Sequence, residues 1–247
     1  MQLKRPKMIL FDYGHTLLAE PEWDFERGAA ALLACAKANP LGVTAQEVSA
    51  FIQGLWKKFH QVLLMDMNHH EHQMMRLTVE SLRLEFDVPL EALEMTFWES
   101  CVELVPLPHI QELLDFLAEQ NIRTGVVSNM TFSGAGLSAR ITKSLRHSFD
   151  FIIASSEYGI RKPDPMIFQL AIAKANLPPE DIWFCGDNPR CDVDASSAAG
   201  MFPVWFTDNT VPCPFRDVTQ DEPLSPHLHI SDWRELIIKL KSLPTAE

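Results

Sequence analysis

The sequence lacks the features that mark membrane-spanning, secreted and nucleic-acid-binding proteins. Its 247 residues carry 21 basic and 33 acidic side chains, a formal net charge of −12, so no basic excess is available for a nucleic-acid backbone or an anionic membrane. No apolar run approaches the ~20 residues of a spanning helix. The apolar run after basic residues 1–7 ends at Phe11, too early for a signal peptide. We therefore expect a soluble cytoplasmic protein that binds neither nucleic acid nor membranes.

Paired cysteines and internal repeats are missing as well. The five cysteines are odd in number and form no Cys-x-x-Cys pair, which is typical of free thiols in a reducing compartment. What is present is an ordinary globular composition, with 47% hydrophobic and 22% charged residues. The length corresponds to roughly 1.6 average domains. One large domain, or a core with an inserted module, fits that length best.

Short apolar runs that each end in a polar residue recur along the chain and predict buried strands. They cover residues 7–11, 123–127, 149–154, 182–185 and 203–206, with a further short strand around 228–230. Helical patterns, such as those at residues 110–117 and 167–175, alternate with them, so we predict an α/β fold with a doubly wound parallel sheet. Ligands bind such sheets outside the carboxyl ends of the strands. Asp12, Ser128 and Asp187 follow three of these ends.

The segment from residue 19 to residue 105 interrupts this alternation. It holds four helical patterns, at residues 25–38, 45–64, 71–86 and 90–104, and no convincing strand. We therefore predict an all-helical cap over residues 19–105, inserted into a core formed by residues 1–18 and 106–247. Residues 208–226 are proline-rich and predict a loop, and Asp232 with Glu235 predicts the start of a last helix.

Four motifs lie in a characteristic order at the predicted strand ends. They are Asp12-Tyr13-Gly14-His15-Thr16, a strand ending in Ser128-Asn129, Lys162 in a Lys-Pro-Asp-Pro run, and Gly186-Asp187 followed by Asp192. Together they resemble the haloacid dehalogenase-like (HAD) hydrolase superfamily, in the phosphatase-type branch whose helical cap is inserted after the first motif. One such match would be a weak signal, but four in order, spread over nearly the whole chain, are specific. The resemblance implies a Rossmann-like core.

The chemistry of these residues agrees with that resemblance. A carboxylate attacks phosphorus only where a hard cation and a fixed positive group screen its repulsion from the substrate's dianion. Asp12, Asp187 and Asp192 supply oxygens that suit Mg²⁺, and Lys162 supplies the fixed charge. We expect Ser128, with nearby backbone N–H groups, to hold the phosphoryl oxygens.

The resemblance assigns roles to the same positions. It implies that Asp12 is the nucleophile that forms an aspartyl-phosphate, and that the Gly14 carbonyl joins Asp12 and the two later aspartates as a Mg²⁺ ligand. It also implies that Ser128, Asn129 and Lys162 bind phosphate. The expected activity is a Mg²⁺-dependent phosphohydrolase acting on a small phosphorylated metabolite, as a monomer or homodimer.

Gly14 departs from the family's pattern. Family phosphatases place a second Asp two residues after the nucleophile, where it protonates the leaving group and activates water. Losing such a group typically lowers the rate by about 10²–10⁴-fold, most severely for poor leaving groups. The candidates for a replacement are His15, the cap histidines His69, His70 and His72, or no residue at all.

Two alternative functions follow from this departure. Phosphonoacetaldehyde hydrolases of the superfamily also lack the second Asp and cleave a C–P bond with a cap lysine, for which Lys57 and Lys58 are formal candidates. The other alternative is a catalytically weak module that binds a phosphometabolite or a protein partner. Dehalogenation is less favoured, because that reaction requires no metal and the fourth motif is acidic.

Overall fold

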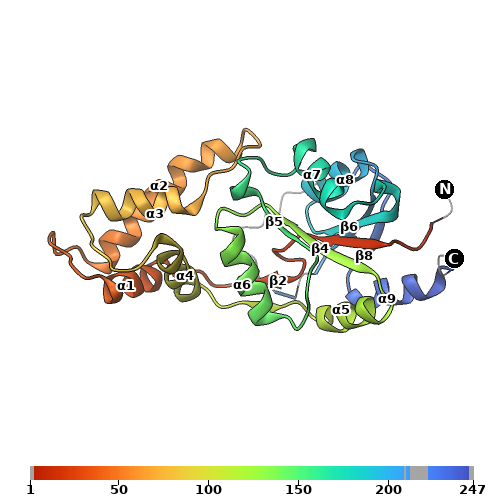
Figure 1. Cartoon of the computed structure of the whole chain (residues 1–247), viewed down its shortest axis with the longest axis horizontal. Helices are drawn as coiled ribbons and strands as arrows, with labels where there is room; N and C mark the ends of the chain where they lie inside the picture. Colours follow the sequence, from red (N-terminus) through yellow and green to blue (C-terminus); the bar gives the residue numbers. More distant parts are fainter. Residues whose placement is uncertain (1–2, 209, 212–221, 245–247) are drawn as a thin grey trace.

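The computed structural model describes residues 3–208, 210–211 and 222–244 (Figure 1). Six of the described strands form one parallel sheet in the order β5-β4-β1-β6-β7-β8. Their bounds are β1 Met8–Phe11, β4 Arg123–Ser128, β5 Ile152–Ala154, β6 Ile182–Gly186, β7 Phe202–Phe206 and β8 Leu228–Ile230. This confirms the predicted α/β fold. The predicted loop at 208–226 falls partly outside the described residues, as does Cys213.

The two faces of the sheet are covered because successive side chains of a strand point to opposite sides. In β1, Ile9 and Phe11 belong to one hydrophobic cluster, whereas Met8 and Leu10 belong to another. Figure 1 shows helices on both sides of the sheet. The first cluster includes residues of α5 (Ile110–Glu119), α6 (Gly134–Ser144) and α9 (Trp233–Ser242), and the second includes residues of α7 (Pro165–Ala175).

Shorter elements are α8 (Ala195–Ala198), the 3₁₀ turns η1 (Ser155–Glu157) and η2 (Pro179–Asp181), and the π-helical turn η3 (Pro189–Asp194).

The segment between the first two motifs forms four described helices at the other end of the molecule (Figure 1). They are α1 Phe25–Cys35, α2 Ala45–Leu63, α3 Glu71–Ser81 and α4 Leu90–Cys101. The prediction that the third helix extends to residue 86 is wrong. Arg83 adopts a left-handed φ of 52°, and the Glu85 carbonyl accepts a hydrogen bond from the Lys37 N–H at 2.7 Å. The chain therefore turns back to pair with the end of α1.

A short ribbon joins this helical segment to the sheet domain. β2 (Leu18–Ala19) pairs antiparallel with β3 (Val105–Pro106), where the sequence predicted no strand. The segment that leaves the core and the segment that re-enters it thus lie side by side. No helix in the described ranges is long and apolar enough to cross a membrane. The division into residues 1–18 with 106–247 and residues 19–105 stays a prediction.

Candidate active site

Three neighbouring strands place the first site residues at one edge of the sheet. Phe11 of β1 is in register with Val126 of β4 and with Cys185 of β6, so Asp12, Ser128 and Asp187 follow at adjacent carboxyl ends. The connection after β1 leads towards β4 and β5, and the connection after β6 leads towards β7. Adjacent strands whose connections run in opposite directions form the crevice where such sheets bind ligands. Asp12 and Asp187 lie at this crevice.

Lys162 lies at the centre of a buried ion-pair cluster. Its Nζ donates to Asp12 Oδ1 at 2.7 Å and to Asp192 Oδ1 at 2.6 Å, and its side chain is 2% exposed. Burial by itself lowers the pKa of Lys162, but the two carboxylates outweigh burial and hold that pKa above its ordinary value. The ammonium group is therefore a permanent positive charge beside the Asp12 carboxylate.

Three carboxylates converge on the same point. Ligand oxygens of Asp12, Asp187 and Asp192 all lie within 4.8 Å of one another, and all three residues are buried. One Lys162 ammonium neutralises one of these three negative charges, which leaves about two in a low-dielectric setting. Burial, together with the Asp12 charge, raises the pKa of Asp192. A hard divalent cation with carboxylate ligands suits this donor set, so the predicted Mg²⁺ site fits the residues present.

The loop after β6 has a shape that requires glycine. A Cβ placed on Gly186 meets the Asp192 carboxylate at 2.4 Å, so a side chain there displaces that carboxylate. The Asn188 N–H donates to Asp192 Oδ2 at 2.9 Å, and the Asn188 side chain accepts from the Cys191 N–H at 2.9 Å. The fourth motif thus folds back on itself and holds its last aspartate against Lys162.

Ser128 and Asn129 stand at the end of β4, as expected. Ser128 is buried at the carboxyl end of that strand. The Asn129 side chain forms two hydrogen bonds with the main chain of Lys162: Nδ2 donates to the carbonyl at 2.8 Å, and Oδ1 accepts from the N–H at 2.7 Å. Its side chain therefore positions Lys162, while its contact with phosphate stays a prediction.

The loop after Asp12 has space where the family's second Asp would stand. A Cβ built on Gly14 meets no heavy atom within 4 Å. The neighbouring His15 adopts a left-handed φ of 52°, and its N–H donates to the Leu18 carbonyl at 2.9 Å. Gly14 leaves an open position beside the nucleophile, whereas the His15 backbone belongs to the turn that enters β2.

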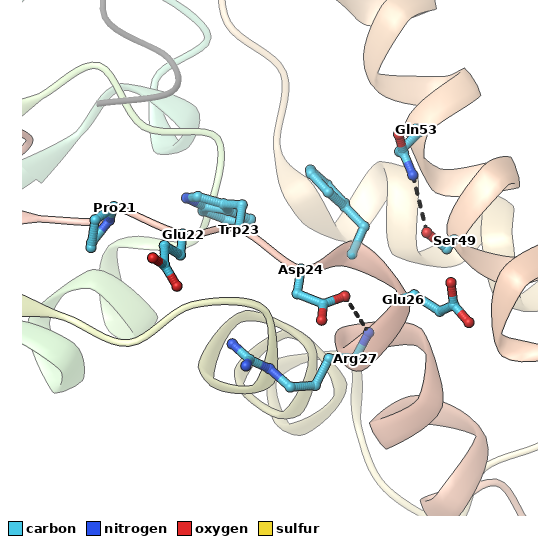
Figure 2. A pocket seen from close by; sticks show the side chains of 9 residues that line it. Pro21, Glu22, Trp23, Asp24, Glu26, Arg27, Ser49 and Gln53 are labelled. Atoms are coloured by element: carbon cyan, nitrogen blue, oxygen red, sulfur yellow. Dashed lines mark hydrogen bonds between the residues drawn. The ribbon is translucent and has the colours of Figure 1, made fainter. Parts of the chain in front are cut away.

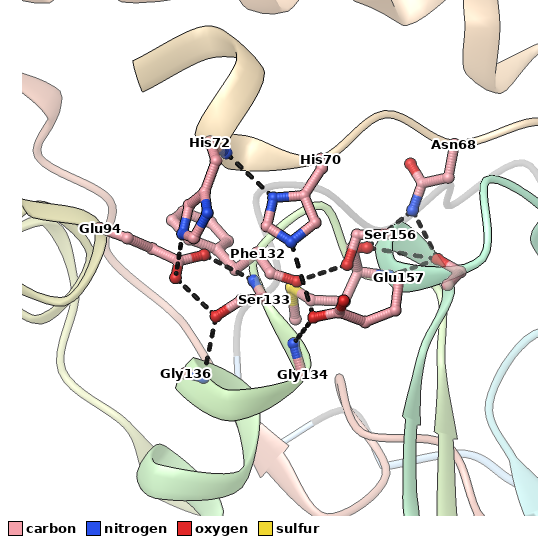
Figure 3. Close-up of polar contacts among 12 residues, drawn as sticks. Asn68, His70, His72, Glu94, Phe132, Ser133, Gly134, Gly136, Ser156 and Glu157 are labelled. Carbon is pink, nitrogen blue, oxygen red and sulfur yellow. Dashed lines mark hydrogen bonds and ion pairs between the residues drawn. The ribbon is translucent and has the colours of Figure 1, made fainter. Parts of the chain in front are cut away.

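The histidine-rich loop connects the cap to the core (Figure 3). His70 Nε2 lies 3.6 Å from Glu157 Oε1, and His72 Nε2 lies 3.1 Å from Glu94 Oε2. The same Glu94 carboxylate accepts hydrogen bonds from the N–H and the hydroxyl of Ser133, which caps α6. His70 thus contacts the core directly, whereas His72 contacts Glu94 of the cap, which in turn binds Ser133 of the core.

His69 is the most buried histidine of this loop. Its ring lies against Phe59, with centroids 4.8 Å apart. Burial, followed by the charges of Arg161 and His70, lowers the pKa of His69 to about 4. A pKa this low disfavours the hypothesis that His69 donates a proton with a pKa near 7. The preceding Asn68 donates to the Met130 carbonyl at 2.7 Å, which fixes the loop on the core.

A cavity of about 580 Å³ opens beside Lys162, between the end of α2 and the loops after β5 and β6. Its walls come from both the cap and the core: His60, Leu63, Leu64, Asp66, Arg161, Lys162, Asn188, Pro189, Arg190, Cys191, Asp194, Glu222 and Leu224. This volume is typical of small-molecule sites. The sequence did not single out Arg161, although its position next to Lys162 was a usable signal. Lys57 and Lys58 are exposed and do not line this cavity.

A second cavity of about 730 Å³ lies within the cap, between the start of α1 and α2 (Figure 2). Some of its polar groups already pair locally. Asp24 accepts from the Arg27 N–H at 2.9 Å, and Gln53 donates to Ser49 at 3.0 Å. Lys162, which donates to Asp12 and Asp192, lines the first cavity and not this one, so we assign the reaction site to the cavity beside Lys162.

Comparison with known proteins agrees with this geometry. Residues 6–200 match the sequence profile of a hydrolase family described as haloacid dehalogenase-like hydrolase. The chain is 32% identical over 133 residues to a phosphoserine phosphatase of Thermus thermophilus, covering 53% of this chain and 51% of that protein. It is 24% identical over 201 residues to a ribulose-1,5-bisphosphate 5-phosphatase of Halopiger xanaduensis, covering 80% and 83%. The chain thus spans about half the length of the Thermus relative.

Solved structures share the fold over the whole length. A HAD phosphatase from Thermococcus onnurineus superposes with a TM-score of 0.59 at 20% identity, covering 96% of this chain and 98% of that chain. At this identity the likeness concerns the fold.

Proposed function

The chain belongs to the haloacid dehalogenase-like hydrolases, and we propose that it is a Mg²⁺-dependent phosphohydrolase of small phosphorylated metabolites. One observation carries the proposal: Asp12, 9% exposed at a strand end, shares Lys162 with Asp192, and its carboxylate lies within 4.8 Å of those of Asp187 and Asp192. The Thermus and Halopiger relatives bear the names of phosphatases, which supports a phosphate monoester as the substrate.

The reaction begins with attack by Asp12. Oδ1 of this carboxylate pairs with Lys162, whereas Oδ2 accepts no hydrogen bond from the described residues and is the oxygen that attacks phosphorus. The new O–P bond forms as the bond from phosphorus to the leaving oxygen breaks. Lys162 and Ser128 hold the phosphoryl oxygens. Asp12, Asp187, Asp192 and the Gly14 carbonyl would hold Mg²⁺, which would supply positive charge to offset that of the phosphoryl group. Water then attacks the aspartyl-phosphate at phosphorus, releases phosphate and restores the carboxylate.

Protonation of the leaving group is the weak step. Gly14 offers no acid, His69 is neutral, and His70 and His72 face glutamates at the cap–core junction. The leaving oxygen therefore takes its proton from solvent. Acyl phosphates and aryl phosphates, whose leaving groups depart without protonation, are expected to react faster than sugar phosphates.

The test is phosphate release from p-nitrophenyl phosphate and acetyl phosphate with Mg²⁺. The wild type should release phosphate, and Asp12→Asn should lose at least about 10³-fold, because the amide is a poor nucleophile. Asp115→Asn removes the same charge from the exposed surface of α5 and serves as the matched control. Equal activity of wild type and Asp12→Asn would refute the proposed nucleophile.

Gly14 also favours a second candidate, a phosphometabolite-binding module with little turnover. It would bind phosphate esters with Mg²⁺ and release none, so wild type and Asp12→Asn would be equally inert. C–P bond cleavage by a cap lysine has no such support, because Lys57 and Lys58 lie outside the cavity. The cytoplasmic location and the monomeric or homodimeric state stay predictions.

A further inference from the structure

The cavity beside Lys162 contains a cation that the proposed reaction does not use. Arg161 is half-buried in its wall, directly before the ammonium that faces Asp12. Its backbone is held in place, because its N–H donates to the Asp66 carbonyl at 3.2 Å and its carbonyl accepts from the Asp164 N–H at 2.9 Å. Its guanidinium forms no hydrogen bond or ion pair with the described part of the chain.

Most acids of the same cavity are engaged elsewhere. The Asp66 carboxylate faces Arg190 at 3.3 Å, and Asp194 accepts the Ser225 N–H at 2.8 Å. Glu222 is an exposed residue at the rim. Burial lowers the pKa of Arg161, and the neighbouring Cys191 and Asp66 offset this only in part. The guanidinium therefore faces the cavity with little compensation from the described anions.

We propose that Arg161 binds a second anionic group of the substrate, a carboxylate or a second phosphate. This inference rests on the proposed function, because it places the reacting phosphate at Lys162 and Ser128. A guanidinium presents a planar fork of donors that matches both kinds of anion in a bidentate contact. Since Arg161 and Lys162 line one cavity of about 580 Å³, one small molecule can present both anionic groups. The substrate class is a small phosphate monoester with a second negative charge.

The experiment compares substrates that differ only in that second group. One pair is 3-phosphoglycerate and glycerol 3-phosphate, where a carboxylate replaces a hydroxymethyl group. The other pair is fructose 1,6-bisphosphate and fructose 1-phosphate. The preference within a pair is the ratio of the two kcat/KM values. A preference in the first pair identifies a carboxylate as the second group, and a preference in the second pair identifies a phosphate.

The expected result is a wild-type preference of at least about 10-fold for the doubly anionic member of one pair. Arg161→Gln should reduce that preference by about 10- to 100-fold, mainly through KM, and Arg161→Lys by less, because it keeps the charge without the fork. Arg146→Gln is the charge-matched control. Arg146 is exposed, precedes β5 whereas Arg161 follows it, and does not line the cavity, so the preference should not change. An unchanged preference in Arg161→Gln overturns the inference.

Binding measurements distinguish failure of the inference about Arg161 from failure of the proposed function. The binding affinity of both substrate pairs is measured by calorimetric titration in the presence of Mg²⁺. The proteins compared are Asp12→Asn and the double variant that also carries Arg161→Gln. An Arg161-dependent preference supports the inference even if no p-nitrophenyl phosphate is hydrolysed. Equal affinity within both pairs overturns it even if hydrolysis depends on Asp12.

Discussion

Replacing Glu71 by Gln tests the electrostatics of the cap–core junction. Glu71 begins α3, is 1% exposed, and its Oε2 has no hydrogen-bond partner in the described part of the structure. Its N–H donates to the Thr131 carbonyl of the core at 2.8 Å. Burial, reinforced by the charge of Glu94, raises the pKa of Glu71 from 4.5 to about 8. The folded protein thus holds a carboxyl group that ionises unfavourably.

The magnitude follows from proton linkage. A folded pKa above the unfolded pKa means that the native state binds the proton more tightly, so the free energy of unfolding falls as pH rises from 4.5 to 8. At pH 7 the difference 7 − 4.5 = 2.5 corresponds to roughly 3 kcal/mol. The N-terminus of α3 favours the ionised form by up to about 1 kcal/mol. Glu71→Gln is therefore expected to stabilise the protein by roughly 2–3 kcal/mol at pH 7.

Urea unfolding followed by circular dichroism between pH 6 and pH 8 measures this effect. The stability advantage of Glu71→Gln should widen by about 1 kcal/mol per pH unit, because the penalty in the wild type grows with pH. Glu91→Gln, an exposed carboxylate in the first turn of α4, is the matched control and should stay within about 0.5 kcal/mol throughout. A constant gap, or a more stable wild type at pH 8, would refute the reasoning.

Three further changes probe the active site. Gly14→Asp places a carboxyl group where an added Cβ meets nothing within 4 Å, and should raise phosphate release from sugar phosphates by about 10-fold or more; an unchanged rate would show that another group donates the proton. Gly186→Ala brings a methyl group 2.4 Å from the Asp192 carboxylate and should weaken Mg²⁺ binding about 10- to 100-fold in a calorimetric titration, whereas wild-type affinity would contradict this. Asn129→Ala removes two hydrogen bonds to the Lys162 main chain and should lower kcat by about 10-fold or more at an unchanged fold by circular dichroism; a wild-type kcat would rule out this positioning role.

The sheet and its reactive edge could be predicted because their signals are local. Four buried residues in a row mark β1, and their alternate side chains enter two different clusters. A polar residue directly after such a run must stand at a strand end, which is why Asp12 and Asp187 could be placed before the structure was known. The helix ends were less predictable. Residues 82–86 continue the pattern of α3, and the left-handed Arg83 together with the pairing of Glu85 ends the helix earlier.

Tertiary structure alone decided what the cap loop and the cavity wall do. The same histidine-rich segment is compatible with a solvated loop, a proton donor or a metal site. Burial of His69 beside Arg161, and contacts from Glu94 to Ser133 across 39 positions, select a docked junction instead. Arg161 likewise lines a cavity only because the end of α2 supplies another part of its wall. The physical reason is that charge compensation and desolvation depend on neighbours brought together from distant parts of the chain. Local sequence patterns cannot predict those neighbours.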